Sequence, residues 1–168
     1  MKFQTLLFTL LLFSCTSFSQ QTFILKLPDA EKLNKRYNEK ETSTDIVYLY
    51  LNENYKSNSV KYAIQTDADF DNIECGFTKK FKHGILFTTN NCGEASPLIQ
   101  KITFPKTNRS TLQKWVELIY KASIPLDSKS TNKWKNNNEY IPKDEEAGCY
   151  YKIIDTSKQS IVEIWCGC

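Results

Sequence analysis

The segment from Cys149 to Cys166, CYYKIIDTSKQSIVEIWC, restricts the fold more than any other part of the chain. An antiparallel hairpin that turns at residues 156–159 places Cys149 directly opposite Cys166. The same register makes five further pairs: Ile154 with Ile161, Ile153 with Val162, Lys152 with Glu163, Tyr151 with Ile164, and Tyr150 with Trp165. These are the apolar, aromatic and opposite-charge pairs that neighbouring strands prefer. Because a slip of one residue would destroy the pattern, the segment predicts a β hairpin with both cysteines on its core face.

A second cysteine pair, Cys75 and Cys92, also stands at the two ends of a segment that resembles a hairpin. A two-residue turn at His83 and Gly84 would bring these cysteines opposite each other, and glycine readily adopts the positive φ that such turns need. Opposed residues of an antiparallel pair lie within reach of a disulfide. We therefore expect two disulfides, Cys75–Cys92 and Cys149–Cys166.

The first 19 residues have the organisation of a secretory signal, with one lysine, an apolar core and small residues at Ser17 and Ser19. This core is too short to span a bilayer as a mature helix. We expect cleavage after Ser19, which leaves residues 20–168 as a single exported domain, periplasmic or extracellular. The alternative is that LFSC acts as a bacterial lipobox, so that Cys15 carries a lipid and anchors the protein to a membrane.

Export also determines how the other cysteines are interpreted, because disulfides are the usual state of cysteine pairs in an oxidising compartment. Signal cleavage would remove Cys15 and lipidation would block its thiol, so five cysteines remain by either route. Because five is an odd number, we expect Cys168 to be unpaired or to be an alternative partner for Cys149. Cys166 and Cys168 would need a third thiolate to hold a soft metal ion. We predict no metal site and no cofactor.

One segment has the pattern of a strong amphipathic helix. Ser110 and Gln113 have the spacing of a capping box. Its apolar stripe consists of Leu112, Trp115, Val116, Ile119 and Tyr120. A shorter helix is expected after Pro28. Residues 22–27, 45–53, 60–66 and 97–104 have the composition and alternation typical of strands. The sequence therefore predicts an α+β domain, a mostly antiparallel sheet built from hairpins with one main amphipathic helix packed on it, braced by disulfides.

The charge balance excludes several classes of partner. Without Lys2 the chain has 21 basic residues, from a total of 22, against 19 acidic ones, a net charge of about +2. We expect no binding to nucleic acid and no membrane contact except through a lipid on Cys15. The sequence gives no indication of the oligomeric state.

No arrangement of residues predicts a catalytic site. The only histidine, His83, falls in an expected hairpin turn, although a Ser-His-Asp or Cys-His enzyme would need it. Residues 67–71 place three aspartates at the spacing of an EF-hand loop but are not followed by its glycine and glutamate.

The long polar segment 123–146 is the best candidate for a contact surface. It carries Trp134 between Lys133 and Lys135, with Tyr140 nearby, and this composition is typical of binding sites for proteins. The alternative is that Trp134 folds back onto the core. We expect an exported, non-enzymatic protein that binds another protein, of the inhibitor, immunity or envelope-accessory type. The alternative function is a small secreted hydrolase that uses a pair of carboxylates.

Overall fold

The structure is a computed structural model that describes residues 23–39, 45–65, 74–92, 98–125, 131–144 and 147–167. Three α helices lie in these residues: α2 (Ala30–Glu39), α3 (Ile46–Asn54) and α4 (Arg109–Ser123). The eight strands are β1 (Tyr62–Gln65), β2 (Glu74–Lys80), β3 (Leu86–Asn90), β4 (Leu98–Pro105), β5 (Asn132–Trp134), β6 (Glu139–Pro142), β7 (Gly148–Asp155) and β8 (Gln159–Gly167). The expected α+β class is confirmed, and α2 is the shorter helix expected after Pro28. Three helices nevertheless lie on the sheet, where one main helix was predicted.

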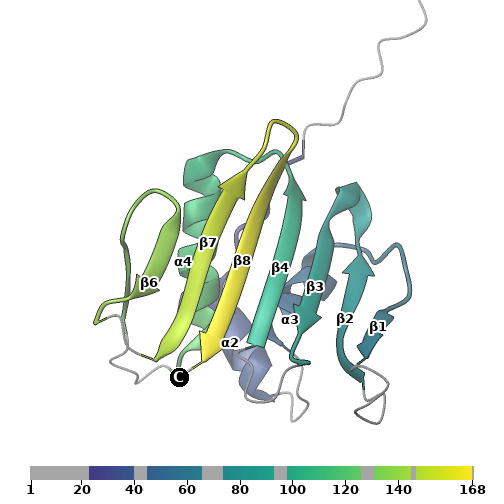
Figure 1. The fold of residues 1–168 in the computed structure, drawn as a ribbon, viewed down its shortest axis with the longest axis horizontal. Helices are drawn as coiled ribbons and strands as arrows, with labels where there is room; N and C mark the ends of the chain where they lie inside the picture. Colours follow the sequence, from purple (N-terminus) through teal and green to yellow (C-terminus); the bar gives the residue numbers. More distant parts are fainter. Residues whose placement is uncertain are drawn as a thin grey trace, which may run out of the picture.

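The strands form one sheet in the order β1-β2-β3-β4-β8-β7-β6-β5, and all neighbouring pairs are antiparallel. Two four-stranded meanders are joined where β4 pairs with β8, and eight residue pairs align there, from Leu98 with Cys166 to Pro105 with Gln159. The three helices all lie on one face of this sheet (Figure 1). The described part of the chain therefore consists of two layers, with the core between helices and sheet.

The β7–β8 hairpin has the register that its sequence predicts, including Cys149 opposite Cys166 and Lys152 opposite Glu163. The Cys149–Cys166 disulfide joins Cα atoms 4.1 Å apart. Tyr151 and Val162 are buried on the side of the sheet that faces the helices. The predicted core face is thus confirmed.

The predicted register of the β2–β3 hairpin is wrong by one residue. Phe81 N–H donates to the Ile85 carbonyl over 2.9 Å, so the loop contains three residues, 82–84, instead of two. Both His83 and Gly84 have positive φ there, at 64° and 77°. The shift places Cys75 beside Asn91, yet the Cys75–Cys92 disulfide still forms, with a Cα–Cα distance of 4.9 Å. The disulfide pairing is therefore confirmed although the register is not.

Residues 45–53, predicted to be a strand, form helix α3. Asp45 caps this helix, because its carboxylate accepts a hydrogen bond from Tyr48 N–H over 2.9 Å. Five of its residues are buried, Ile46, Val47, Leu49, Tyr50 and Leu51, which places apolar residues on nearly every side. A helix that is apolar on nearly every side has no clear 3.6-residue hydrophobic period, so its pattern cannot be told from that of a buried strand.

The N-terminal segment, predicted to be a strand, is extended chain without a strand partner over the described residues 23–27. Tyrosines of and beside α3 hold its backbone: Tyr55 Oη accepts from Lys26 N–H at 3.0 Å, and Tyr50 Oη donates to the Lys26 carbonyl. Leu25 is buried, whereas Ile24 is exposed. Side-chain hydroxyls thus replace the hydrogen bonds of a β ladder.

Helix α4 buries the whole predicted stripe, Leu112, Trp115, Val116, Ile119 and Tyr120. The predicted capping box is wrong, because the helix begins one residue before Ser110. Asn108 is the cap, and its side-chain oxygen accepts from Ser110 N–H at 2.9 Å. Gln113 instead donates to the Asn137 carbonyl over 3.1 Å and so links the helix to the β5–β6 loop.

Two disulfides indicate a protein exported from the cytoplasm. No helix in the described part of the chain is long and apolar enough to cross a membrane. The predicted signal at residues 1–19, with Cys15, lies outside the described residues, as do the aspartates at 67–71 and Cys168.

Candidate functional site

The sheet has one face that no helix or strand of the described residues covers, which we call the open face (Figure 1). Because side chains alternate along a strand, the residues beside the buried ones point to this side. On the β4–β8 pair and on its two neighbours, β3 and β7, the open face includes Leu86, Thr88, Ile99, Lys101, Thr103, Tyr150, Lys152, Ile154, Ile161, Glu163 and Trp165, with Glu139 on β6.

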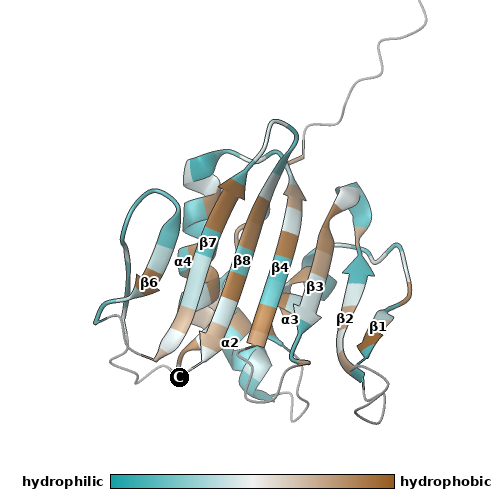
Figure 2. Cartoon of the chain, in the orientation of Figure 1, coloured by the Kyte–Doolittle hydropathy of each residue, from teal (hydrophilic) through white to brown (hydrophobic). Residues whose placement is uncertain are grey.

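The middle of the open face is a row of alternating charge. Strand register places Lys101 on β4 beside Glu163 on β8, Glu163 beside Lys152 on β7, and Lys152 beside Glu139 on β6. Lys101 Nζ and Glu163 Oε1 are 3.3 Å apart. In Figure 2 the middle parts of β4, β8 and β7 have hydrophilic colouring. We call these four residues the charge row.

Apolar side chains flank the charge row on both sides. Toward one end of the strands lie Ile161 and Ile154, which are cross-strand neighbours. Toward the other end Tyr150 stacks on Trp165, with ring centroids 5.7 Å apart and the planes 4° from parallel, and Ile99 is 48% exposed beside them. Half-buried aromatic side chains with an exposed isoleucine are typical of the central part of a protein interface.

The four residues predicted as a contact surface lie on β5, on β6 and directly after β5, but they face two ways. Trp134 and Tyr140 are cross-strand partners on the helix side, where their rings are 4.9 Å apart and Trp134 Nε1 donates to Glu117 of α4 over 2.8 Å. Lys133 and Lys135 are exposed. The half-buried Trp134 packs against the core, as the alternative interpretation held, and a binding role for these residues stays a prediction.

A cavity of about 270 Å³ lies between the helices and the sheet. Apolar side chains from α3, α4, β4 and β8 line it, together with the Cys149–Cys166 disulfide. Its polar lining includes Asp45, Gln100 and Ser123. No lysine or arginine lines the cavity among the described residues.

Asp45 is a titratable group in the lining of this cavity. Burial raises the pKa of its carboxyl, although hydrogen bonds from Tyr48 N–H and the Gln100 side chain oppose the change. A carboxyl that holds its proton above the usual range is suited to general acid chemistry. The hydrolase alternative needs a second carboxylate, and Asp45 is the only acid among the described lining residues.

Asp45→Asn should gain stability relative to the wild type as the pH rises from 4 to 7. The unfolded aspartate ionises near pH 4, whereas the folded one keeps its proton to higher pH, so this group's contribution to stability falls as pH rises through its raised pKa. Asparagine caps a helix as well as aspartate and does not ionise. Urea denaturation at both pH values measures the effect.

Asp45→Ala is the matched control, because it also removes the ionisation but loses the cap. Its free energy of unfolding should change with pH as that of Asp45→Asn does, but should be about 1 kcal/mol lower at each pH. An asparagine variant that parallels the wild type at both pH values would mean that Asp45 ionises normally in the folded protein.

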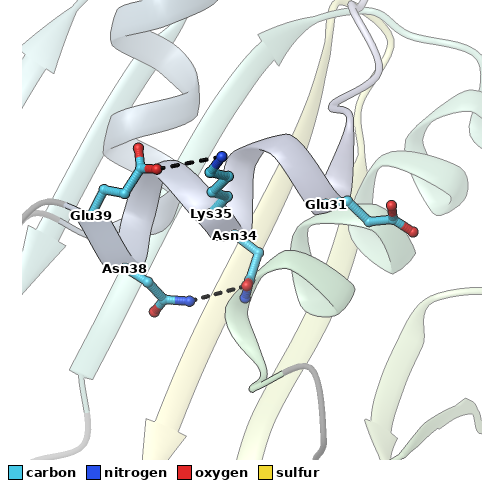
Figure 3. Close-up of a pocket in the computed structure, with 5 residues that line it drawn as sticks. All are labelled: Glu31, Asn34, Lys35, Asn38 and Glu39. Atoms are coloured by element: carbon cyan, nitrogen blue, oxygen red, sulfur yellow. Dashed lines mark hydrogen bonds and ion pairs between the residues drawn. The ribbon is translucent and has the colours of Figure 1, made fainter.

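A larger hollow, of about 500 Å³, runs along the outside of α2 and is open to solvent (Figure 3). Its polar groups are already paired: Lys35 with Glu39 at 3.8 Å, and Asn38 with the Asn34 side-chain oxygen at 3.0 Å. The Asn34 amide also donates to the Ala122 carbonyl at 2.8 Å, which ties α2 to the end of α4. The hollow therefore follows from helix packing and offers no group in need of a ligand.

The remaining chemical candidates do not assemble into a site. His83 is exposed at the tip of the β2–β3 loop, and its ring lies 5.9 Å from that of Phe23. Within the described ranges, no three potential metal-ligating side chains lie together.

Comparison with known proteins shows no relative of this chain. No family model, curated protein or solved structure matches this chain.

Proposed function

We propose that this is an exported, non-enzymatic binding protein that contacts another protein through its open face. The supporting observation is the combination on one uncovered surface of the Tyr150–Trp165 stack, the exposed Ile99 and the charge row. Exposed apolar groups bordered by charged residues are characteristic of surfaces that bind proteins. Inhibitor, immunity and envelope-accessory proteins all fall within this class.

The charge pattern of the open face favours a protein over a polyanion. Lys101 and Lys152 are each next to an acidic residue in the charge row, so positive potential does not accumulate there. Nucleic acids and anionic membranes bind to patches of a single sign. A protein surface can match alternating charges one by one, and such matching provides specificity.

The hydrolase alternative has less support. Asp45 has the environment of a catalytic acid, but the described cavity supplies no second carboxylate and no histidine. We therefore assign the cavity no reaction.

We propose further that residues 1–19 direct export and are removed, and the two disulfides support this route. Mass spectrometry of the purified protein should find an N-terminal peptide that begins at Gln20. A diacylglyceryl group on Cys15 would instead establish the lipid-anchored form, with the same folded domain.

The binding proposal is tested by affinity capture with tagged protein from culture and envelope fractions. The informative variants are Ile99→Asp on the open face and Leu27→Asp in the segment before α2, since both residues are 48% exposed. We expect one protein to be recovered with the wild type and with Leu27→Asp but not with Ile99→Asp, while circular dichroism shows all three folded. Equal capture by both variants would exclude the open face as the binding surface.

A further inference from the structure

We propose that the partner at the open face is a second copy of this chain, packed face to face about a two-fold axis parallel to the strands and between β7 and β8. This inference rests on the proposed function, because it assigns the partner of the same surface. It follows from the order of charges along the charge row and from the apolar side chains on either side of it.

The charge row reads positive, negative, positive, negative across β4, β8, β7 and β6. Such a row changes sign when it is reversed about its midpoint, which lies between β8 and β7. A two-fold axis at that midpoint, parallel to the strands, reverses the row of the second copy. It therefore places Glu163 opposite Lys152 of the second copy and Lys101 opposite Glu139 of the second copy, and every charge meets its opposite.

The other two-fold arrangement of facing sheets is excluded by the same residues. An axis that runs along the charge row would place each strand against itself, so that Lys152 would meet Lys152 and Glu163 would meet Glu163. Like charges brought together in an interface are strongly unfavourable, so the charge row selects one of the two arrangements in which the strands of the facing sheets are nearly aligned.

The selected axis also matches the apolar side chains. It places Ile161 opposite Ile154 of the second copy, and Trp165 opposite Tyr150 of the second copy. Facing sheets pack about 10 Å apart with their strands nearly aligned, which brings such side chains into contact. The apolar residues then supply burial, and the charge row fixes the register.

The charges nearest the axis are available for contacts between chains. Lys152 is exposed and forms no ion pair with any other described residue. Glu163 pairs with Lys101 on its own sheet, and its side chain remains 32% exposed. Each dimer would contain the Lys152–Glu163 contact twice.

Charge reversal tests the arrangement. The purified, disulfide-bonded wild type should have a dimeric mass by analytical ultracentrifugation. Lys152→Glu and Glu163→Lys should each raise the dimer dissociation constant by roughly 100-fold or more, since each creates two like-charge contacts per dimer. An equimolar mixture of the two variants should form a heterodimer, because both contacts are then of opposite charge.

The mixture also separates contacts between chains from effects within one chain. Residues 152 and 163 are neighbours within the sheet, so either reversal places like charges side by side in each chain. Those neighbours are unchanged in the mixture, and a recovered dimer therefore reports the contact between chains. The double variant Lys152→Glu/Glu163→Lys should dimerise alone.

The proposal is overturned if the wild type is monomeric at tens of micromolar, if either single variant dimerises like the wild type, or if the mixture stays monomeric. A monomer whose affinity capture is lost with Ile99→Asp would show that the open face binds a different protein, so the proposed function would stand without this inference. Wild-type behaviour of Ile99→Asp in both assays would refute both.

Discussion

Replacing Trp115 with alanine is expected to lower the free energy of unfolding by about 3–5 kcal/mol. Trp115 is fully buried at the centre of the α4 stripe. Its ring meets Tyr50 of α3 edge-on at 5.7 Å and Phe104 of β4 edge-on at 5.2 Å. Alanine would therefore remove the contact that joins two helices to the sheet and leave a cavity among all three, which urea denaturation would measure directly.

Trp134→Ala provides the comparison for this experiment. Trp134 also packs its indole ring against the core, but it is only half-buried. It belongs to the short β5–β6 hairpin and contacts α4 through its hydrogen bond to Glu117. Trp134→Ala should lower the free energy of unfolding clearly less than Trp115→Ala does. An unfolding midpoint unchanged by Trp115→Ala would mean that α4 is not the main core helix.

Removing the Cys149–Cys166 disulfide with two alanines should destabilise the protein by about 3 kcal/mol in the chain-entropy model. The disulfide closes a sequence separation of 17 residues on the hairpin that pairs with β4. Urea denaturation of the double variant under non-reducing conditions tests this value. Non-reducing peptide mapping of the wild type would contradict the pairing if Cys149 were found bonded to Cys168.

The Cys75–Cys92 disulfide is a matched control, because it closes the same sequence separation of 17 residues. The entropic contribution of the two bonds is therefore nearly equal, and a difference between the two double alanine variants would report their surroundings. We expect the larger loss for Cys149–Cys166, since both cysteines pack against the core. Equal losses would mean that the core contacts of Cys149 and Cys166 contribute little.

The elements that could be predicted from the sequence are those whose evidence is local. The β7–β8 hairpin has several side-chain pairs that agree on one register, so its geometry follows from its own residues. Helix α3 could not be predicted, because its burial on several sides depends on α4 and the sheet. The β2–β3 register depended on one loop residue, Lys82, and no pattern in the sequence showed that the loop contains it.

The open face could not be predicted for a different reason. Lys152 and Glu163 were paired from the sequence, but Lys101 and Glu139 joined them only through the order of the strands. β4 and β8 are neighbours although their paired residues are about 60 positions apart in the sequence. No local pattern predicts that strands so far apart in the chain will pair. The predicted contact surface was instead chosen by composition, which identified Trp134 but not the direction in which it points.

The two outermost strands of the sheet have a consequence for solubility. Unpaired backbone groups on an edge strand can recruit further strands and lead to aggregation. Here the edges are β1, of four residues and interrupted by a register shift at Ile64/Gln65, and β5, of three residues and with Lys133 exposed. Short length, irregularity and an exposed lysine all discourage strand addition. The sheet therefore resists open-ended growth into fibrils while its broad side stays free for a limited association.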